Sequence, residues 1–192
     1  MLGDTTGSTT MRIFIAGSSR DTCNPAYNVA AATIGGYIAA TPECQLVFGG
    51  CKFGLMGKVY APVAATGKSD KIIIAISEKY VADLDGLLSG MTITCSNLRD
   101  RKHALIAMAD VLIFLPGGPG TYDELFTAIE TKRSGEHNKP IIIVNIDNHY
   151  EHFLGMLKRA ENDRFADNYE GILYHVVNSA SDAIALLSQL QK

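Results

Sequence analysis

The feature that most constrains this chain is a series of short, continuous apolar runs that alternate with longer segments of helical pattern. A run that is apolar throughout is typical of a strand covered on both faces of a sheet. Repeated alternation of strand and helix favours crossover connections and a mostly parallel sheet. The predicted strands are Arg12–Ala16, Gln45–Phe48, Lys71–Ile76, Thr92–Cys95, Val111–Leu115, Pro140–Ile146 and Tyr174–Val177.

The segments between these strands carry the predicted helices. We therefore expect an α/β fold, a Rossmann-like, doubly wound, mostly parallel sheet of about seven strands, as a single domain over residues 11–192. Residues 1–10 are small and polar and lack the parts of a signal peptide, so we expect a flexible N-terminal tail. The predicted helices are Pro25–Ala40, Leu55–Thr66, Leu98–Ala109, Thr121–Arg133, Tyr150–Glu161 and Ser181–Gln191.

Composition and charge exclude several classes of protein. Hydrophobic residues make up 47% of the chain and charged residues 19%, which excludes general disorder. A formal net charge of −3 argues against a nucleic-acid-binding domain. The longest apolar stretch, 104–115, contains Asp110 and is too short to span a membrane. The four cysteines form no C-x-x-C pair, so we expect no zinc site, reduced thiols and a cytoplasmic location.

Glycines gather in three loops that follow predicted strands. In a doubly wound sheet, ligands bind outside the carboxyl ends of the strands, and glycine lets the backbone approach them closely. None of the three loops is a G-x-G-x-x-G fingerprint or a P-loop. The H-E-x-x-H motif is absent as well, since His149 and His152 are three residues apart, and we expect them to be a surface pair on a helix. Eight of the 18 glycines belong to these loops: Gly17, Gly49, Gly50, Gly54, Gly57, Gly117, Gly118 and Gly120.

The segment Pro116–Glu124, with the sequence PGGPGTYDE, is the strongest candidate site. It predicts a strand, a glycine turn and a helix that begins near Thr121, whose amides and dipole would attract a phosphate. A second interpretation stays open, because Thr121 and Glu124 also have the spacing of a capping box.

A basic helix start lies upstream, at Asn97–Lys102. Three of four successive residues, Arg99, Arg101 and Lys102, are basic. Cations at this end of a helix oppose its dipole, so the pattern indicates a bound anion. The alternative is an ordinary solvated first turn.

Together, the Arg-Lys helix start and the P-G-G-x-G-T-x-x-E motif resemble the LOG (Lonely Guy) family, which is also labelled "possible lysine decarboxylase". The resemblance covers roughly Met11 to Leu187 and includes the G-S-S turn at Gly17 and the G-L-M-G sequence at Gly54–Gly57. It implies a phosphoribohydrolase that releases free base and ribose 5-phosphate from a nucleoside 5′-monophosphate of cytokinin or AMP type. It also implies a homodimer that needs no metal and no cofactor.

The same resemblance implies the site residues. Arg101 and Glu124 match the catalytic pair. The substrate and phosphate site would comprise Gly17, Ser18, Gly49, Gly50, Lys102, Gly117, Gly118, Gly120, Thr121 and Asp123. The decarboxylase label conflicts with chemistry, since that reaction normally uses pyridoxal phosphate on a lysine and the motif offers none in that role.

The chain departs from the family pattern at three places. Cys51 stands where a third glycine is common, Glu130-Thr131 where Thr-Trp is usual, and Arg133 where Gln is frequent. These positions bear on base recognition and on the subunit contact. Two other functions remain open: a non-catalytic nucleotide or molybdopterin carrier on the same fold, and a self-associating structural protein.

Overall fold

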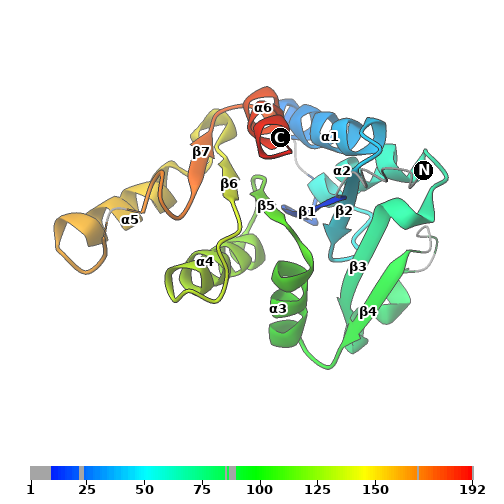
Figure 1. The fold of residues 1–192 in the computed structure, drawn as a ribbon, viewed down its shortest axis with the longest axis horizontal. Coiled ribbons are helices and arrows are strands. Elements are labelled where there is room, and N and C mark those ends of the chain that lie inside the picture. Colours follow the sequence, from blue (N-terminus) through cyan, green and yellow to red (C-terminus); the bar gives the residue numbers. More distant parts are fainter. Residues whose placement is uncertain (1–9, 22–23, 85, 87–89, 168, 192) are drawn as a thin grey trace, which may run out of the picture.

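A seven-stranded parallel sheet forms the centre of the protein (Figure 1). The computed structural model describes residues 10–21, 24–84, 86, 90–167 and 169–191. All but one residue of the expected N-terminal tail lies outside the described residues. The strand order is β4-β3-β2-β1-β5-β6-β7, and every pair is parallel, which confirms the predicted fold class. The strands are β1 (Met11–Ala16), β2 (Cys44–Phe48), β3 (Ile72–Ser77), β4 (Met91–Cys95), β5 (Val111–Phe114), β6 (Ile141–Val144) and β7 (His175–Val177).

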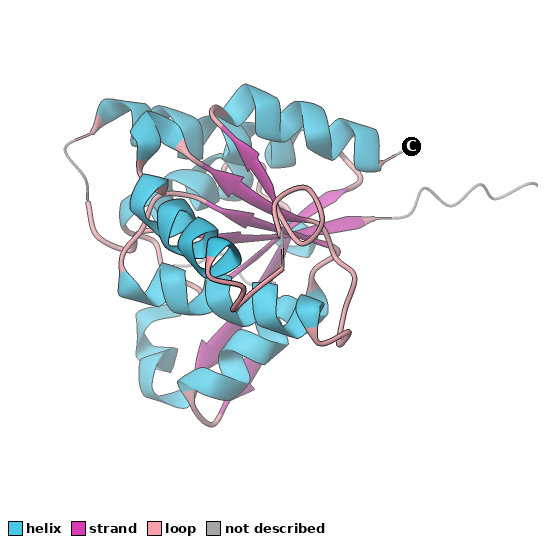
Figure 2. Cartoon of the chain, turned by 90° about the vertical axis from the view of Figure 1, so that its left-hand side faces the viewer, coloured by secondary structure: helices cyan, strands magenta, loops and turns pink. Residues whose placement is uncertain are grey.

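Helices cover both faces of this sheet (Figure 2). Successive strand residues enter opposite cores, so that Ile13 and Ile15 pack with the helices of one face and Phe14 with those of the other. This two-sided burial explains the continuous apolar runs. One face carries α1 (Pro25–Ala40), α2 (Gly54–Ala64) and α6 (Ala180–Leu190); the other carries α3 (Leu98–Met108), α4 (Pro119–Arg133) and α5 (Glu151–Asn162).

The short connections contain structure that the sequence patterns did not predict. Three 3₁₀ segments are present: η1 (Ser69–Lys71), η2 (Glu78–Leu84) and η3 (Ile146–Asn148).

No helix in the described part of the chain is both long enough and apolar enough to cross a bilayer.

The order of the strands reverses between β1 and β5. The chain leaves β1 toward β2, β3 and β4 on one side, and returns through α3 to β5 on the other. The loops that follow these two strands therefore diverge, which leaves a crevice at their carboxyl ends. This crevice is where the glycine loops meet.

A buried lysine joins the end of α1 to the sheet. Lys71 is 4% exposed, and its Nζ donates to the carbonyl oxygens of Ile38 (2.9 Å), Thr41 (2.5 Å) and Cys44 (3.2 Å). Burial lowers the pKa of Lys71. Its ammonium satisfies the Ile38 carbonyl in the last turn of α1, where carbonyls lack a partner within the helix, together with the Thr41 and Cys44 carbonyls that follow.

Replacing this lysine should destabilise the fold. Lys71→Met keeps the length of the side chain but leaves three carbonyls without their donor, and we expect the free energy of unfolding to fall by about 2–4 kcal/mol. Urea denaturation measures the loss. The exposed Lys68 is the matched control, and Lys68→Met should change stability by less than about 0.5 kcal/mol. Equal stability of the two variants would contradict the role given to Lys71.

Candidate functional site

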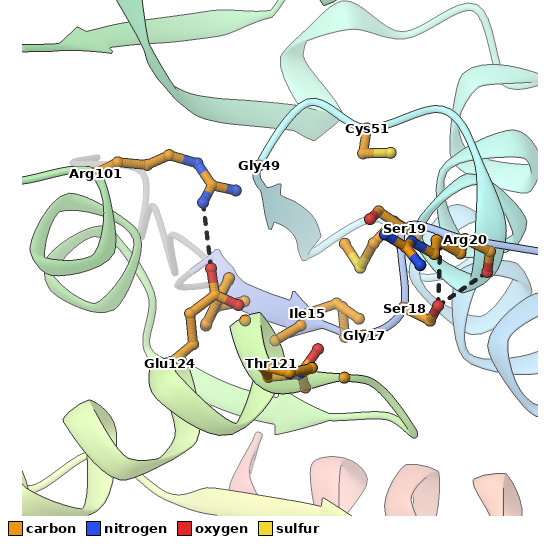
Figure 3. Close-up of a pocket in the computed structure, with 16 residues that line it drawn as sticks. Ile15, Gly17, Ser18, Ser19, Arg20, Gly49, Cys51, Arg101, Thr121 and Glu124 are labelled. Carbon is orange, nitrogen blue, oxygen red and sulfur yellow. Dashed lines mark hydrogen bonds and ion pairs between the residues drawn. The ribbon is translucent and has the colours of Figure 1, made fainter. Parts of the chain in front are cut away.

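A cavity of about 560 Å³ lies in the crevice between β1 and β5 (Figure 3). Loops after three strands and the first turn of α4 form its wall, as the positions of the glycines predicted. Its lining consists of Phe14, Ile15, Ala16, Gly17, Ser18, Ser19, Arg20, Gly49, Cys51, Met56, Arg101, Gly118, Pro119, Gly120, Thr121 and Glu124.

Arg101 and Glu124 meet in the wall of this cavity. Arg101 lies in the first turns of α3, where the Asn97 side chain caps the helix by accepting from the Asp100 amide. Its Nη1 donates to Glu124 Oε1 at 3.3 Å, and its Nε donates to the Ala75 carbonyl in β3. The two side chains are only 21% and 14% exposed. The pair therefore links α3 and α4 to β3 at a position that solvent reaches only in part.

Gly49 provides the space that Arg101 occupies. A Cβ added at Gly49 would lie 1.7 Å from Arg101 Nη2, and the three atoms nearest to it all belong to Arg101. The end of β2 and the guanidinium thus approach more closely than any side chain at position 49 permits. In Figure 3 the guanidinium extends between Gly49 and Glu124.

The Glu124 carboxyl holds its proton more tightly than an exposed glutamate does. Burial raises the pKa of Glu124 above its ordinary value, and the nearby Arg101 charge opposes this rise without cancelling it. Carboxyls that act as acids or bases near neutral pH commonly have pKa values raised in this way.

The start of α4 forms the opposite side of the cavity. The helix begins at Pro119, two residues before the predicted start, and its N-cap is Gly118, without a side-chain cap. The capping-box interpretation of Thr121 and Glu124 is therefore wrong, since Glu124 turns to Arg101 instead. Because proline has no N–H, the amides of Gly118 and Gly120 are the donors that this helix end offers. Together with the helix dipole they favour an anion.

Eight of the twelve predicted site residues line the cavity: Gly17, Ser18, Gly49, Arg101, Gly118, Gly120, Thr121 and Glu124. The sequence patterns missed the strand residues 14–16 and Met56, which reach the cavity through tertiary packing. They also did not single out Ser19, Arg20 and Pro119, although these belong to the same loops as predicted residues and could have been included on that ground.

The other four predicted residues do not line the cavity. Lys102 Nζ lies 2.7 Å from both carboxylate oxygens of Asp123, so this pair ties α3 to α4 outside the cavity. Gly50 has a φ of 77°, and a Cβ there would meet the side chain of Leu84, which is not part of the lining. Gly117 packs against the buried Thr121, whose Oγ1 would lie 2.1 Å from an added Cβ.

Of the three departures from the family pattern, only Cys51 touches the cavity. Glu130 and Arg133 form an exposed ion pair with each other along α4, and Thr131 is buried with its hydroxyl bonded to the Thr127 carbonyl.

The prediction that both histidines lie on the surface of a helix is wrong for His149. His152 is exposed on α5, whereas His149 precedes that helix and is half-buried against Gly117. Among the described residues, no three His, Cys, Asp or Glu side chains are grouped so that they could hold a metal ion.

The chain is similar in sequence to known proteins. The family described as "Possible lysine decarboxylase" matches residues 56–187. Cytokinin riboside 5′-monophosphate phosphoribohydrolase LOG2 of Arabidopsis thaliana is 32% identical over 150 residues, which cover 77% of this chain and 68% of the relative. The corresponding enzyme LOG7 of the same plant is 28% identical over 183 residues, 94% of this chain and 81% of the relative.

Solved structures with a similar fold carry different descriptions. The Moco carrier protein from Chlamydomonas reinhardtii superposes with a TM-score of 0.69 at 22% identity, covering 94% of this chain and 97% of that chain. The molybdenum cofactor binding protein of Rippkaea orientalis gives a TM-score of 0.65 at 18% identity, covering 97% and 99%. At such identities the likeness establishes the fold alone.

Filling the space at Gly49 should separate Arg101 from Glu124 without unfolding the protein. In Gly49→Ala the flexible end of Arg101 must move, so stability should change by less than about 1 kcal/mol. Removing the guanidinium charge should raise the pKa of Glu124 further, as an NMR titration of its side-chain carboxyl would show. The control is Gly36→Ala on α1, where an added Cβ meets nothing within 4 Å. An unchanged Glu124 titration in Gly49→Ala would contradict this geometry.

Proposed function

The chain belongs to the possible lysine decarboxylase (LOG) family, and from this premise we propose that it hydrolyses the N-glycosidic bond of a nucleoside 5′-monophosphate. The products would be the free base and ribose 5-phosphate. The observation that carries the proposal is the Arg101–Glu124 pair in the cavity wall, close to the uncapped start of α4. The names of the relatives, cytokinin riboside 5′-monophosphate phosphoribohydrolases, support the substrate class.

The charge distribution of the cavity orients the proposed substrate. The phosphate is assigned to the first turn of α4, where the amides of Gly118 and Gly120 meet the positive end of the helix dipole. Arg20 supplies a further cation from the loop after β1. With the phosphate there, the ribose extends toward Glu124, one helical turn farther along α4.

The proposed reaction follows from the bond that breaks. The C1′–N bond cleaves with its electron pair leaving on the base, and the sugar acquires oxocarbenium character. The oxygen of a water molecule bonds to C1′, its proton passes to Glu124, and the departing base takes up a proton. The Glu124 carboxylate stabilises the positive sugar, and its raised pKa makes it a more effective base than an ordinary exposed glutamate. Arg101 orients Glu124 and the nucleotide.

Lysine decarboxylation is not the activity that we propose, despite the family's description. That chemistry normally uses a lysine to hold pyridoxal phosphate as a Schiff base. Among the described residues no lysine lines the cavity, and Lys102, the nearest one in the motif, is engaged by Asp123.

A carrier of a nucleotide or of molybdopterin is the second candidate. Its support is the likeness of the fold to the Moco carrier protein over nearly the whole chain. A carrier needs the anion-binding helix start and the cavity, but it does not need a carboxylate and an arginine poised together. The two candidates therefore differ in what the Arg101–Glu124 pair is for.

Incubation with a panel of nucleoside 5′-monophosphates, including AMP and isopentenyl-AMP, tests the proposal. Chromatography should detect free base and ribose 5-phosphate in equal amounts. Glu124→Gln and Arg101→Met should each lower the rate by about 10²–10⁴, because each removes a group that acts in the transition state. Glu151→Gln, which changes an exposed carboxyl on α5, is the control and should retain the wild-type rate.

Two results would contradict the hydrolase. One is wild-type turnover in the Glu124 or Arg101 variant while each is folded by circular dichroism. The other is tight binding of a panel member, seen by calorimetry, with no release of base from any member; that result favours the carrier.

We also propose that the protein is a homodimer, as its family resemblance implies. The small residues of α1 do not decide the question, because Ala30 and Ala31 are buried in the core of the subunit itself. Sedimentation equilibrium of the purified protein should give twice the 20.7 kDa chain mass, and a concentration-independent monomer would contradict the proposal.

A further inference from the structure

A strained loop after β6 presents His149 to the glycine turn. Asp147 and Asn148 have φ values of 50° and 57°, in the left-handed region that residues with a Cβ seldom adopt. The conformation is held at several points. The Asn145 amide donates to the Val177 carbonyl, Asn145 Oδ1 accepts from the Tyr150 amide at 2.7 Å, and Asp147 Oδ2 accepts from Asn24 Nδ2 at 2.8 Å.

Aromatic rings enclose His149. Tyr122 of α4 stacks on the imidazole with a centroid distance of 6.2 Å and an interplanar angle of 9°. Tyr27 of α1 and Tyr150 meet it edge-on at 5.7 Å and 5.0 Å. Three elements thus fix the plane of the ring, so that its Nε2 has one direction in which to bond.

That direction is toward the backbone of Gly117. His149 Nε2 lies 3.1 Å from the Gly117 nitrogen and 3.0 Å from the Gly117 carbonyl oxygen. A single ring nitrogen either accepts from the amide or donates to the carbonyl, so the position of the imidazole proton selects which bond forms. The Tyr122 hydroxyl, at 3.4 Å, is a weaker third contact.

Which of these two hydrogen bonds forms decides whether the peptide that joins Gly117 to Gly118 is held in a fixed orientation. In a trans peptide the carbonyl and the next N–H point in opposite directions, and the described residues contain no cis peptide bond. When Nε2–H holds the Gly117 carbonyl, the Gly118 N–H points away from His149, which stands outside the cavity lining. Gly118 itself lines the cavity.

We propose that His149 is a positioning residue for the phosphate end of the cavity: with a proton on Nε2 it holds the Gly117 carbonyl and thereby aims the Gly118 amide at a bound phosphate or similar dianion. With Nε2 unprotonated, the ring holds the Gly117 amide instead and leaves that peptide free to turn. The neutral imidazole carries one hydrogen, on either ring nitrogen, whereas the protonated ring carries hydrogen on both. The fraction of rings that donate from Nε2 therefore rises as pH falls, and anion binding should strengthen with it. The inference rests on the phosphate placement of the proposed function.

The tyrosine hydroxyls around the ring do not produce this pH dependence. The hydroxyls of Tyr122 and Tyr150 have pKa values raised by burial, and they stay neutral below pH 8. Tyr27 is the aromatic neighbour from α1, Asp147 is the nearest carboxyl of the same loop, and Glu124 acts on Tyr150 from α4. A carboxylate that is neutralised at low pH would also strengthen anion binding, so variants at position 149 are needed to assign the effect.

Calorimetric titration with sulfate between pH 5 and pH 8 tests the proposal. Sulfate remains a dianion over this interval, whereas a phosphate monoester gains a proton near pH 6. The wild-type affinity should rise several-fold toward pH 5. His149→Phe, which keeps the ring but has no donor, should bind about five- to tenfold more weakly at pH 5 and lose most of the pH dependence. His149→Gln, whose amide carries an N–H donor at every pH, should restore affinity with a flat pH profile. His152→Gln is the control and should match the wild type.

The outcomes separate this inference from the hydrolase itself. Sulfate binding by His149→Phe equal to the wild type at every pH overturns it. Equal weakening in the Phe and Gln variants also overturns it, because the ring would then act only through packing. If His149→Phe fails to fold, the comparison of the wild-type and Gln pH profiles decides. Loss of the wild-type pH dependence in His149→Phe, in a protein that releases no base, would support the role of His149 and contradict only the proposed reaction.

Discussion

The structure depends on the burial of each central strand on both faces. Residues such as Ile13, Phe14, Ile113 and Phe114 are almost fully inaccessible, with neighbours entering opposite cores. A sheet covered on both sides must connect its strands through helices, and parallel strands that are joined in this way all end at one edge. The loops that carry Gly17, Gly49 and Gly118 therefore meet at that edge. The cavity is a consequence of this topology before any polar side chain is considered.

The polar chemistry of the cavity depends on one close approach. Arg101 can reach both the β3 carbonyl of Ala75 and the Glu124 carboxylate because position 49 has no side chain. This places two ionisable groups where water only partly screens them. Burial then favours a neutral Glu124 while Arg101 favours the charged one, and the carboxyl is left between the two tendencies. A glycine in a strand-end loop thus acts on the protonation of a residue 75 positions later.

Periodicity and loop composition predicted the seven strands, the six helices and the edge of the sheet at which the cavity lies, because these features follow from local residue patterns. The family resemblance placed Lys102 and Asp123 at the ligand, yet the structure pairs them with each other, since packing decides which faces of α3 and α4 meet. Strand residues 14–16 reach the cavity only because the adjoining loops diverge at β1 and β5. His149 could not be found from sequence, because its contact with Gly117 depends on two left-handed residues and three enclosing rings.

The electrostatics of the cavity bear on the choice between an enzyme and a carrier. The helix start, Arg20 and Arg101 all favour a bound anion, whereas Glu124 repels one and loses solvation by being buried beside it. A protein that only had to hold an anionic ligand would bind it more tightly with a neutral residue at position 124. The carboxylate becomes favourable when positive charge develops on the ligand, as it does on a ribose whose glycosidic bond is breaking. Glu124 is therefore better explained by stabilisation of a transition state than by retention of a ligand, although the fold itself is equally suited to both.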